Sequence, residues 1–577
     1  MLRILIASAM LTIALAAEAA APAPIGADHG MVVSAQRLAS EVGVDILKQG
    51  GNAVDAAVAT GYALAVVWPA AGNLGGGGFM SLRLADGRSM FVDFREKAPL
   101  AATETMFQDA QGHAVPKLST SGWLAVGVPG SVAGLDYALT HFGTISRAAV
   151  MAPAIRLARE GFVLGPADVT ILDLGVDDFR QDPATASIFL DHGKPYEVGA
   201  RFVQPQLAAT LEAVAAQGPV AFYQGDTARE IVKASTAGGG ILGAKDLASY
   251  KVGELAPITC SYRGYDIQSA PPPSAGGIAL CEALNILEGY DLRGLGYHSA
   301  ASVHLLVEAM RRAFLDRQVL GDPAFVANPV ALLTGKDYAA RLRATIDPVR
   351  ATPSAALGPT PADTEGRQTT HFSVADAEGN AVSVTTTLND WFGNRRVAGT
   401  TGVLMNDEMD DFAAAPGASN MFGLLASRAN VVAPGKTPVS SMSPTIVTRG
   451  GKLVMVIGSP GGSRIISTVL QAIIDTVDYD MTIEEAIDAP RLHQQWMPDV
   501  VDLEPRALSP DTRRILEGNG YVFKEQPPWS VAEGVLAGAP SLAATSAGIS
   551  PLAIPPKPFA LYGASDDRGP AGAAIGY

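Results

Sequence analysis

Residues 369–376 read Thr-Thr-His-Phe-Ser-Val-Ala-Asp, residues 378–380 read Glu-Gly-Asn, and residues 381–388 read Ala-Val-Ser-Val-Thr-Thr-Thr-Leu. The two longer stretches alternate in polarity and contain many β-branched residues, so they predict two antiparallel strands joined by a turn. A further apolar strand, residues 453–457, leads through the glycine-rich segment 458–462 into an expected helix. The second half of the chain is therefore expected to open on β-structure.

Helical and hairpin patterns surround these strands. Residues 52–67 and 300–318 carry apolar residues in the pattern of buried helices. Residues 79–84 and 89–94 predict a hairpin that places Arg95 at its end. Strands in the middle of the sequence pattern with helices on both sides predict a layered α/β sandwich.

Four consecutive glycines, Gly75 to Gly78, precede this hairpin. No Gly-Lys-Ser or Gly-Lys-Thr follows them, and their spacing is not that of a dinucleotide-binding turn, so the pattern argues against a phosphate loop. We expect them instead to let neighbouring backbones approach closely.

Composition limits the class of protein and of partner. The chain has 577 residues, of which 48% are hydrophobic and 17% charged. This composition is typical of a globular protein with a large core. The formal net charge is −15, and because nucleic acids are polyanions, the charge argues against a nucleic-acid partner. It does not limit a small zwitterionic substrate, since local groups decide its binding.

The N-terminus has the pattern of a secretory signal. Arg3 is followed by an apolar run from Ile4 to Ala17, and small residues stand at Ala17 and Ala19. We expect residues 1–21 to be removed and the protein to be periplasmic or secreted. The run is shorter than the ~20 residues of a membrane span, and we expect no stable span, although an uncleaved anchor remains an alternative.

Two further features concern linkage along the chain. Residues 347–368 are rich in Pro and Ala and predict an exposed connector that ends at Gln368. The two cysteines, Cys260 in an expected strand and Cys281 in an expected helix, exclude a disulfide scaffold and a cysteine-based zinc cluster. Two buried thiols are the favoured reading, and a disulfide is left open.

Thr369 carries a chemical possibility of its own. A threonine hydroxyl becomes a useful nucleophile when a base lies beside it, and that base can be the residue's own α-amino group. A terminal amine has a pKa of about 7.7–8.0, which suits proton transfer near neutral pH. The chain must first be cut between Gln368 and Thr369 to release this amine, and the same hydroxyl can attack the carbonyl of Gln368. Taken alone, a threonine at a strand start is weak evidence for this chemistry.

The motifs around Thr369 strongly resemble the γ-glutamyltranspeptidase (glutathione hydrolase) family of N-terminal-nucleophile hydrolases. The resemblance covers nearly the whole mature chain. The motifs are Gly75 to Phe79, Asp93-Phe94-Arg95-Glu96, Pro271-Pro272-Pro273-Ser274, Thr369 to Val374, Gly379-Asn380, Val382-Ser383, Thr385, Thr387-Leu388-Asn389, Phe392-Gly393, Asn406 to Phe412, Pro438 to Thr445 and Gly458 to Arg464. The resemblance implies a four-layer αββα sandwich built from two subunits, residues 22–368 and 369–577, that are cut from one precursor and stay together as a heterodimer.

The resemblance also implies catalytic roles. Thr369 would be the self-processing residue and the nucleophile, and Thr387 would support it by a hydrogen bond. Gly461 and Gly462 would form the oxyanion hole, because N–H groups at a helix N-terminus are unpaired and positively polarised. His371 is not expected to act as a base, since the terminal amine fills that role; a packed or hydrogen-bonded histidine is favoured.

The implied substrate has an α-amino acid head group. Arg95 would bind its carboxylate through a two-bond fork, with help from the hydroxyls of Ser440 and Ser441. Three acceptors would take the ammonium: Asn389, Glu408 and Asp411. The family varies between an acid and an amide at the position of Glu408.

The chain departs from the family pattern in several places. The family often has a lid loop with a tyrosine, whereas the comparable stretch, Pro416 to Leu425, has Phe422. Asp390-Trp391 and Asn394-Arg395-Arg396 differ from the small residues expected there and could reshape the acceptor side. Residues 539–559 form an apparent insertion that is expected to be a surface loop.

The implied reaction is a two-step acyl transfer without a metal or organic cofactor. Thr369 attacks the γ-glutamyl amide of glutathione or a relative, and the acyl group passes to water or to an acceptor amino acid or dipeptide. One alternative is a related acylase or amidohydrolase with another acyl group, such as glutaryl. The retained Arg95 and Asp411 argue against it, because a substrate without an ammonium has no use for the acid. A non-enzymatic exported binding protein on the same fold is the other alternative.

Overall fold

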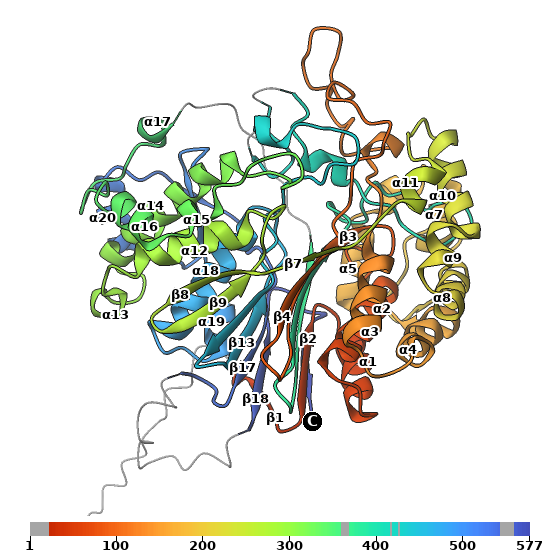
Figure 1. The fold of residues 1–577 in the computed structure, drawn as a ribbon, viewed down its shortest axis with the longest axis horizontal. Helices are drawn as coiled ribbons and strands as arrows, with labels where there is room; N and C mark the ends of the chain where they lie inside the picture. The colour runs from red at the N-terminus through yellow and green to blue at the C-terminus, as the bar shows by residue number, and fades with distance from the viewer. Residues whose placement is uncertain (1–21, 359–368, 416–417, 425–426, 543–558) are drawn as a thin grey trace, which may run out of the picture.

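The protein is described by a computed structural model that covers residues 22–358, 369–415, 418–424, 427–542 and 559–577. The expected signal peptide and Gln368 lie outside these residues. Two large β-sheets face each other in the middle of the molecule, and helices cover the outer side of each sheet (Figure 1). The four-layer αββα sandwich expected from the sequence is confirmed.

The first sheet contains the strands around Thr369. Its order is β19-β2-β10-β11-β3-β4-β7, and every neighbouring pair is antiparallel. The two predicted hairpins are both present in it and pair with each other through β11 and β3. Its strands are β2 (Gly30–Ser34), β3 (Gly77–Arg83), β4 (Ser89–Asp93), β7 (Gly253–Leu255), β10 (Thr370–Asp376), β11 (Ala381–Thr387) and β19 (Ala573–Gly576).

The second sheet has the order β1-β18-β17-β13-β12-β9-β8. Met31 and Val33 of the first sheet pack against Ile446, Val456 and Val535 of the second, and these apolar side chains fill the space between the sheets. The strands of the second sheet are β1 (Ile25–Ala27), β8 (Ile258–Tyr262), β9 (Tyr265–Ser269), β12 (Thr445–Arg449), β13 (Lys452–Gly458), β17 (Glu533–Ala537) and β18 (Leu561–Ser565).

Two groups of helices form the outer layers. On the first sheet lie α1 (Arg37–Lys48), α2 (Ala53–Val67) and α3 (Ser131–Phe142), and α4 (Arg147–Glu160) packs on α2. Every residue of α2 is buried, because its small Ala-rich faces pack against α1 and α4 as well as against β10. On the second sheet lie α12 (Gly276–Leu287) and α18 (Arg464–Val477), and α14 (Ala300–Asp316) and α16 (Lys336–Arg343) pack on α12.

The remaining elements are short or peripheral. The helices are α5 (Pro166–Asp173), α6 (Val176–Phe179), α7 (Pro183–Phe189), α8 (Pro205–Gln217), α9 (Pro219–Tyr223), α10 (Asp226–Ala237), α11 (Ala244–Ala248), α13 (Leu292–Leu295), α15 (Val330–Leu333), α17 (Ser354–Leu357), α19 (Ile483–Asp488) and α20 (Pro510–Gly518), with 3-10 turns η1 (Trp123–Ala125), η2 (Arg317–Val319), η3 (Glu408–Asp411) and η4 (Arg428–Asn430). The strands are β5 (Phe162–Val163), β6 (Arg201–Phe202), β14 (Leu492–His493), β15 (Val501–Leu503) and β16 (Phe523–Glu525).

Both sheets combine strands from before and after Thr369. β10 pairs with β2 on one side, and β11 pairs with β3 on the other. In the second sheet, β12 pairs with β9. A cut before Thr369 would break none of these ladders, so the two pieces have a physical reason to stay together.

Two expectations from the sequence are wrong. Cys260 in β8 and Cys281 in α12 form a disulfide rather than two thiols, because α12 packs on β8 and brings their Cα atoms to 5.9 Å. The connector is also not exposed throughout its described part. Ser354 is fully buried and donates a hydrogen bond to the carbonyl of Trp496, so residues near α17 pack against the second half of the chain.

Within the described residues, no helix is both long and apolar enough to cross a membrane. The insertion at 539–559 lies mostly outside these residues, since only 539–542 and 559 are described.

Candidate active site

The β10–β11 ladder places Thr369 beside Thr387. Thr370 pairs with Thr386, so the next position outward brings Thr369 and Thr387 to the same end of the two strands. Both residues are buried and line one pocket. The Thr387 hydroxyl accepts a hydrogen bond from the N–H of Asn389 at 2.8 Å, so its own proton can point elsewhere.

The four glycines bring a third strand close to this end. A Cβ added at Gly78 would lie 2.3 Å from the carbonyl oxygen of Thr385, and one at Gly76 would lie 2.0 Å from that of Thr387. Neither distance is compatible with a side chain. The prediction that these glycines allow close backbone packing is confirmed.

Gly461 and Gly462 form the link between β13 and α18, as predicted. Their φ angles are +126° and +56°, values that glycine adopts without strain. Gly462 lines the pocket with Thr369. Within the described residues, the N–H groups of both glycines have no hydrogen-bond partner in the protein. Unpaired N–H groups at a helix N-terminus stabilise a developing negative charge.

Arg95 lies at the end of β4 and is almost fully buried. Its guanidinium forms ion pairs with Glu408 at 2.5 Å and with Asp411, and Glu96 lies 3.8 Å away. The contact with Glu408 is close but lacks hydrogen-bond geometry. Arg95 was expected to bind the carboxylate of a zwitterionic substrate, and Glu408 and Asp411 were expected to bind its ammonium. In the structure these residues pair with one another.

Burial and mutual charge set the protonation of this cluster. Burial raises the pKa of Glu408 well above its usual value, and Arg95 only partly opposes this. Burial likewise raises the pKa of Glu96 to about 7. For Arg95, burial lowers the pKa, but Glu408, Asp411 and Glu96 together outweigh burial and raise it. Arg95 therefore stays a cation.

Asp411 and Asn389 are held by neighbouring groups. One oxygen of Asp411 meets Arg95, and the other accepts a hydrogen bond from the side chain of Asn420 at 2.9 Å. The amide nitrogen of Asn389 donates to the carbonyl of Asp407 at 3.0 Å. Since the amide nitrogen is used by the protein, the amide oxygen of Asn389 is the atom that can accept from a ligand.

The two serines lie across the pocket and are braced from behind. Ser274, which follows the three prolines, donates to the carbonyl of Met442 at 2.7 Å, and the carbonyl of Ser440 accepts from Ala275 N–H. The Ser440 hydroxyl accepts from the N–H of Met442 at 3.0 Å. The buried Ser441 hydroxyl has no hydrogen-bond partner within the described part of the chain. It is therefore available to donate to a bound carboxylate.

One pocket brings together nine of the ten residues expected to be catalytic or substrate-binding; Gly461 is not among its lining residues. The pocket is lined by Arg95, Arg317, Thr369, Thr387, Asn389, Glu408, Asp411, Phe422, Leu424, Ser440, Ser441, Met442, Gly462 and Ile465. The sequence motifs assigned no role to four of these residues: Arg317, Leu424, Met442 and Ile465. Arg317 could not be found from spacing, because it follows a long helix and carries no local motif.

The ring of Phe422 packs against Gly462. A Cβ added at Gly462 would lie 2.3 Å from Cδ1 of its ring. The loop is fixed by hydrogen bonds from Met421 N–H to Asp410 and from Gln495 to the carbonyl of Phe422. Pro416, Gly417 and Leu425 of this stretch lie outside the described residues. Phe422 has no hydroxyl, so it contacts the site through its apolar ring alone.

His371 is fully buried, and the prediction that it is packed and hydrogen-bonded is confirmed. Its ring nitrogens lie 2.9 Å from the Thr385 hydroxyl and 3.1 Å from the Ser373 hydroxyl. Burial lowers its pKa to about 3, so the ring is neutral at physiological pH.

The unusual residues after Asn389 lie outside the pocket lining. Asp390 forms an ion pair with Arg395, and Trp391 packs edge-on against Trp68. Their influence on an acceptor stays a prediction.

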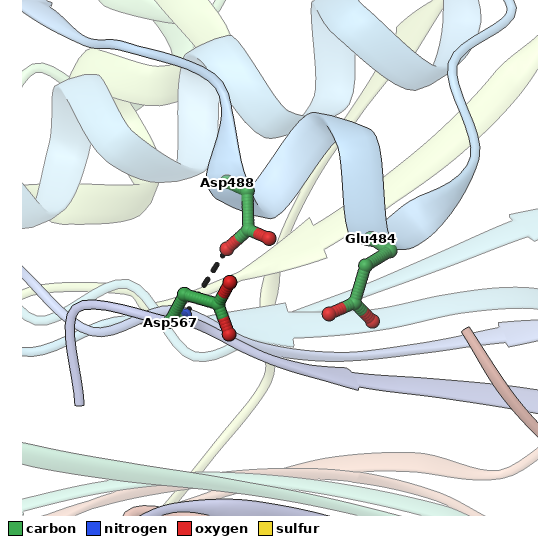
Figure 2. Close-up of side chains that lie close together, drawn as sticks. All are labelled: Glu484, Asp488 and Asp567. Carbon is green, nitrogen blue, oxygen red and sulfur yellow. Dashed lines mark hydrogen bonds between the residues drawn. The ribbon is translucent and has the colours of Figure 1, made fainter. Parts of the chain in front are cut away.

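Away from the pocket, three carboxylates gather at α19 and the segment after β18. Figure 2 shows Glu484, Asp488 and Asp567 around one gap, and Asp488 accepts a hydrogen bond from the N–H of Asp567 at 3.1 Å. Asp567 is exposed and Glu484 is buried. Exposed acidic groups often gather without an ion, and we assign no metal to this cluster.

The fold and the site define the class of protein. An αββα sandwich with a buried threonine at the start of a central strand is the architecture of N-terminal-nucleophile hydrolases. The family model described as Gamma-glutamyltranspeptidase matches residues 39–575, and the chain belongs to this family. The resemblance found in the sequence is confirmed.

Known proteins extend this comparison. A glutathione hydrolase proenzyme of Pseudomonas sp. (strain A14) is 53% identical over 562 residues, which cover 97% of this chain and 96% of the relative. A glutathione hydrolase proenzyme of Escherichia coli (strain K12) is 45% identical over 557 residues, covering 96% and 93%. The crystal structure of cephalosporin acylase from Bacillus halodurans superposes with a TM-score of 0.82 at 26% identity and covers 99% of both chains.

Proposed function

We propose that this chain is an autoprocessing γ-glutamyltransferase and glutathione hydrolase with Thr369 as its nucleophile. The observation that carries the proposal is the pocket itself, in which Thr369 faces a buried arginine, buried acids and two serines. A nucleophile next to groups of both charges suits an acyl donor with a zwitterionic head, and γ-glutamyl amides have such a head.

The first reaction would be the cut of the chain. The Thr369 hydroxyl attacks the carbonyl carbon of Gln368, the Gln368–Thr369 amide bond breaks, and water opens the resulting ester. The products are a large subunit, residues 22–368, and a small subunit, residues 369–577, whose strands remain hydrogen-bonded as a heterodimer. Thr369 then has a free α-amine that can accept the hydroxyl proton.

Turnover would repeat this chemistry on the substrate. Thr369 Oγ attacks the γ-carbonyl while its proton passes to the α-amine, and the N–H groups of Gly461 and Gly462 bind the oxyanion. The amide C–N bond breaks, and the departing amine takes the proton. Water then releases glutamate, or an amino acid or dipeptide takes the acyl group. The scheme needs no metal or organic cofactor.

Head-group recognition would follow the charges. Arg95, Ser440 and Ser441 bind the α-carboxylate, and Asn389, Glu408 and Asp411 bind the ammonium. A ligand would have to replace the ion pairs that Arg95 makes with Glu408 and Asp411. The zwitterion can do so without leaving a charge unpaired, because it supplies one charge of each sign.

We also propose that the protein is exported and loses residues 1–21. The signal-like N-terminus supports this, and the Cys260–Cys281 disulfide agrees with an oxidising compartment.

A related acylase activity is the second candidate, since a cephalosporin acylase shares the fold over the full length. Asp411 distinguishes the two candidates, because an acyl group without an ammonium would leave its carboxylate without a role in substrate binding. A non-enzymatic binding protein is disfavoured by the retained Thr369, Thr387 and oxyanion glycines.

The test is a denaturing gel of the wild-type protein beside Thr369→Ala, followed by N-terminal sequencing and an assay with L-γ-glutamyl-p-nitroanilide and glutaryl-p-nitroanilide. We expect two wild-type bands, the smaller starting at Thr369, one uncut band for the variant, and a preference for the γ-glutamyl substrate. A cut protein that prefers the glutaryl substrate would favour the acylase. An uncut wild-type protein would favour the binding protein.

A further inference from the structure

Arg317 stands in the wall of the active-site pocket. It follows α14 directly and begins the turn η2, so the rigid helix fixes where its side chain starts. Only 7% of the residue is exposed, and its side chain lines the same pocket as Thr369. It also lines an adjoining pocket with Asp411 and Asn420, so it stands between the two spaces.

Arg317 is a buried cation without a bonded anion. Within the described residues it makes no ion pair with a carboxylate, and its Nε has no hydrogen-bond partner. Other buried arginines are paired: Arg312 contacts Glu308 at 2.6 Å, and Arg491 contacts Asp566 at 2.5 Å. A buried charge is costly unless it is paired and hydrogen-bonded. An unpaired guanidinium in a pocket wall therefore points to an anionic ligand.

The neighbouring charges narrow the choice of ligand. Asp411 lies near Arg317, but its two oxygens are already used by Arg95 and Asn420. Burial lowers the pKa of Arg317 to about 10, with Asp411 opposing and Arg95 adding to the decrease, so the group is still a cation at neutral pH. Arg95 and Arg317 carry like charges and repel each other. An anion bound to both guanidinium groups would reduce this repulsion.

Arg95 already has two acids beside it. Its two terminal nitrogens contact Glu408 and Asp411. A carboxylate has about four lone-pair sites, so the α-carboxylate can accept hydrogen bonds from a second guanidinium as well as from Arg95 and the two serines.

We propose that Arg317 is a second carboxylate-binding residue of the donor site, which shares the α-carboxylate of the γ-glutamyl group with Arg95 and thereby helps determine specificity. This inference rests on the proposed function. It adds a residue to the head-group site and assigns the α-carboxylate, not the ammonium, to Arg317.

The competing account is indirect: Arg317 could act only by holding the charge of Asp411, which faces the ammonium. Three small ligands separate the two accounts. L-Glutamate carries both head-group charges, glutarate lacks the ammonium, and 4-aminobutyrate lacks the α-carboxylate. Binding is measured on the self-cut protein by isothermal titration, so the result does not depend on turnover.

The variants are Arg317→Met, which removes the charge at similar length, and Arg317→Gln, which keeps a polar group if the first variant is unstable. Arg317→Lys tests rescue by charge alone. Arg343→Met is the matched control, because Arg343 lies outside the pocket lining and donates to the carbonyls of Asn285 and Ile286. Each variant is first checked on a denaturing gel for the cut before Thr369.

We expect Arg317→Met and Arg317→Gln to raise the Kd of glutamate and of glutarate by about 10- to 100-fold, as for a lost charge-assisted hydrogen bond. The Kd of 4-aminobutyrate should change by less than about threefold, the Lys variant should be intermediate, and the control should match the wild type. Unchanged glutarate binding, or an equal loss for 4-aminobutyrate, would overturn the proposal.

The same experiment separates this inference from the proposed function. If glutamate binds in an Arg317-dependent way but no γ-glutamyl anilide is hydrolysed, the function fails and the binding role stands. If the wild type hydrolyses the anilide and the Arg317 variants bind all three ligands normally, the function stands and the binding role fails. If the wild type hydrolyses no anilide and binds neither glutamate nor glutarate, both fail.

Discussion

Replacing Gly462 by alanine adds one methyl group at a crowded point of the loop between β13 and α18. The added Cβ would lie 2.3 Å from Cδ1 and 2.7 Å from Cε1 of Phe422, so the ring has to move. The φ angle of +56° adds a backbone cost, which for a non-glycine residue is about 1–2 kcal/mol. Overpacking of a filled site costs about 1–3 kcal/mol more. We expect a total loss of about 2–5 kcal/mol in the free energy of unfolding.

Gly450 provides a matched control. It has the same φ angle of +56°, but nothing lies within 4 Å of the position that its Cβ would take. Gly450→Ala should therefore show the backbone cost of about 1–2 kcal/mol without the steric one. The difference between the two variants isolates the contact with Phe422.

The assay is scanning fluorimetry for Tm together with kcat and KM for L-γ-glutamyl-p-nitroanilide, on protein shown to be cut. Gly462→Ala keeps its N–H, so a loss of kcat would report that this donor or the ring of Phe422 has moved. We expect kcat to fall by about 10- to 100-fold, which does not exceed the effect of removing one oxyanion-hole donor. Gly450→Ala should leave kcat unchanged. In a Phe422→Ala background, Gly462→Ala should cost no more Tm than Gly450→Ala does. Equal Tm losses for the two glycine variants in the wild-type background would refute the packing argument.

Three further predictions address charge and linkage. Asp411→Asn should lower kcat/KM for the γ-glutamyl anilide by about 10- to 100-fold, the value of a charge-assisted hydrogen bond, and that for the glutaryl anilide by less than about threefold. Burial and Asp488 raise the pKa of Glu484 to about 8, so between about pH 4.5 and 8 the folded state binds a proton that the unfolded state has lost. The free energy of unfolding should therefore fall as pH rises through this range. Glu484→Gln should make the accompanying fall in Tm smaller. Cys260→Ser/Cys281→Ser should lose roughly 3 kcal/mol of stability, since the disulfide closes a loop with a sequence separation of 21.

Each of these has an outcome that contradicts it. Equal losses on both anilides would mean that Asp411 acts by holding the pocket together and not on the ammonium. A wild-type Tm that rises with pH across this range, with Glu484→Gln parallel to it, would mean that Glu484 ionises normally. For the cysteines, we expect a reducing agent to lower the wild-type Tm, but not below the Tm of the double serine variant. If neither the reducing agent nor the double substitution changed Tm, the disulfide would contribute nothing to stability.

Much of the fold could be predicted because its signals are local. The alternation over 369–376 and 381–388 gave β10 and β11, and the hairpin before Arg95 gave β3 and β4 within two residues of their observed ends. The glycine-rich segment 458–462 marked the passage from β13 to α18. Strand and helix periods, turns and caps act over a few residues, so the sequence displays them directly.

Errors arose where two distant segments meet. The disulfide depends on how α12 packs on β8, and neither cysteine reveals this from its neighbours. Ser354 looked exposed among prolines and alanines, yet Trp496 and the second half of the chain cover it. Tertiary packing decides burial and side-chain pairing of this kind, and composition cannot.

By itself, the sequence determined the family, the layered fold and the residue types of the site, because each is carried by ordered local motifs. Only the tertiary structure decided that Arg95 is paired with both Glu408 and Asp411, that Phe422 packs over Gly462, and that Arg317 joins the pocket. These facts join residues that are far apart in the chain. Their energies depend on burial and on distances between charges, and both exist only once the two sheets and their helices have packed together.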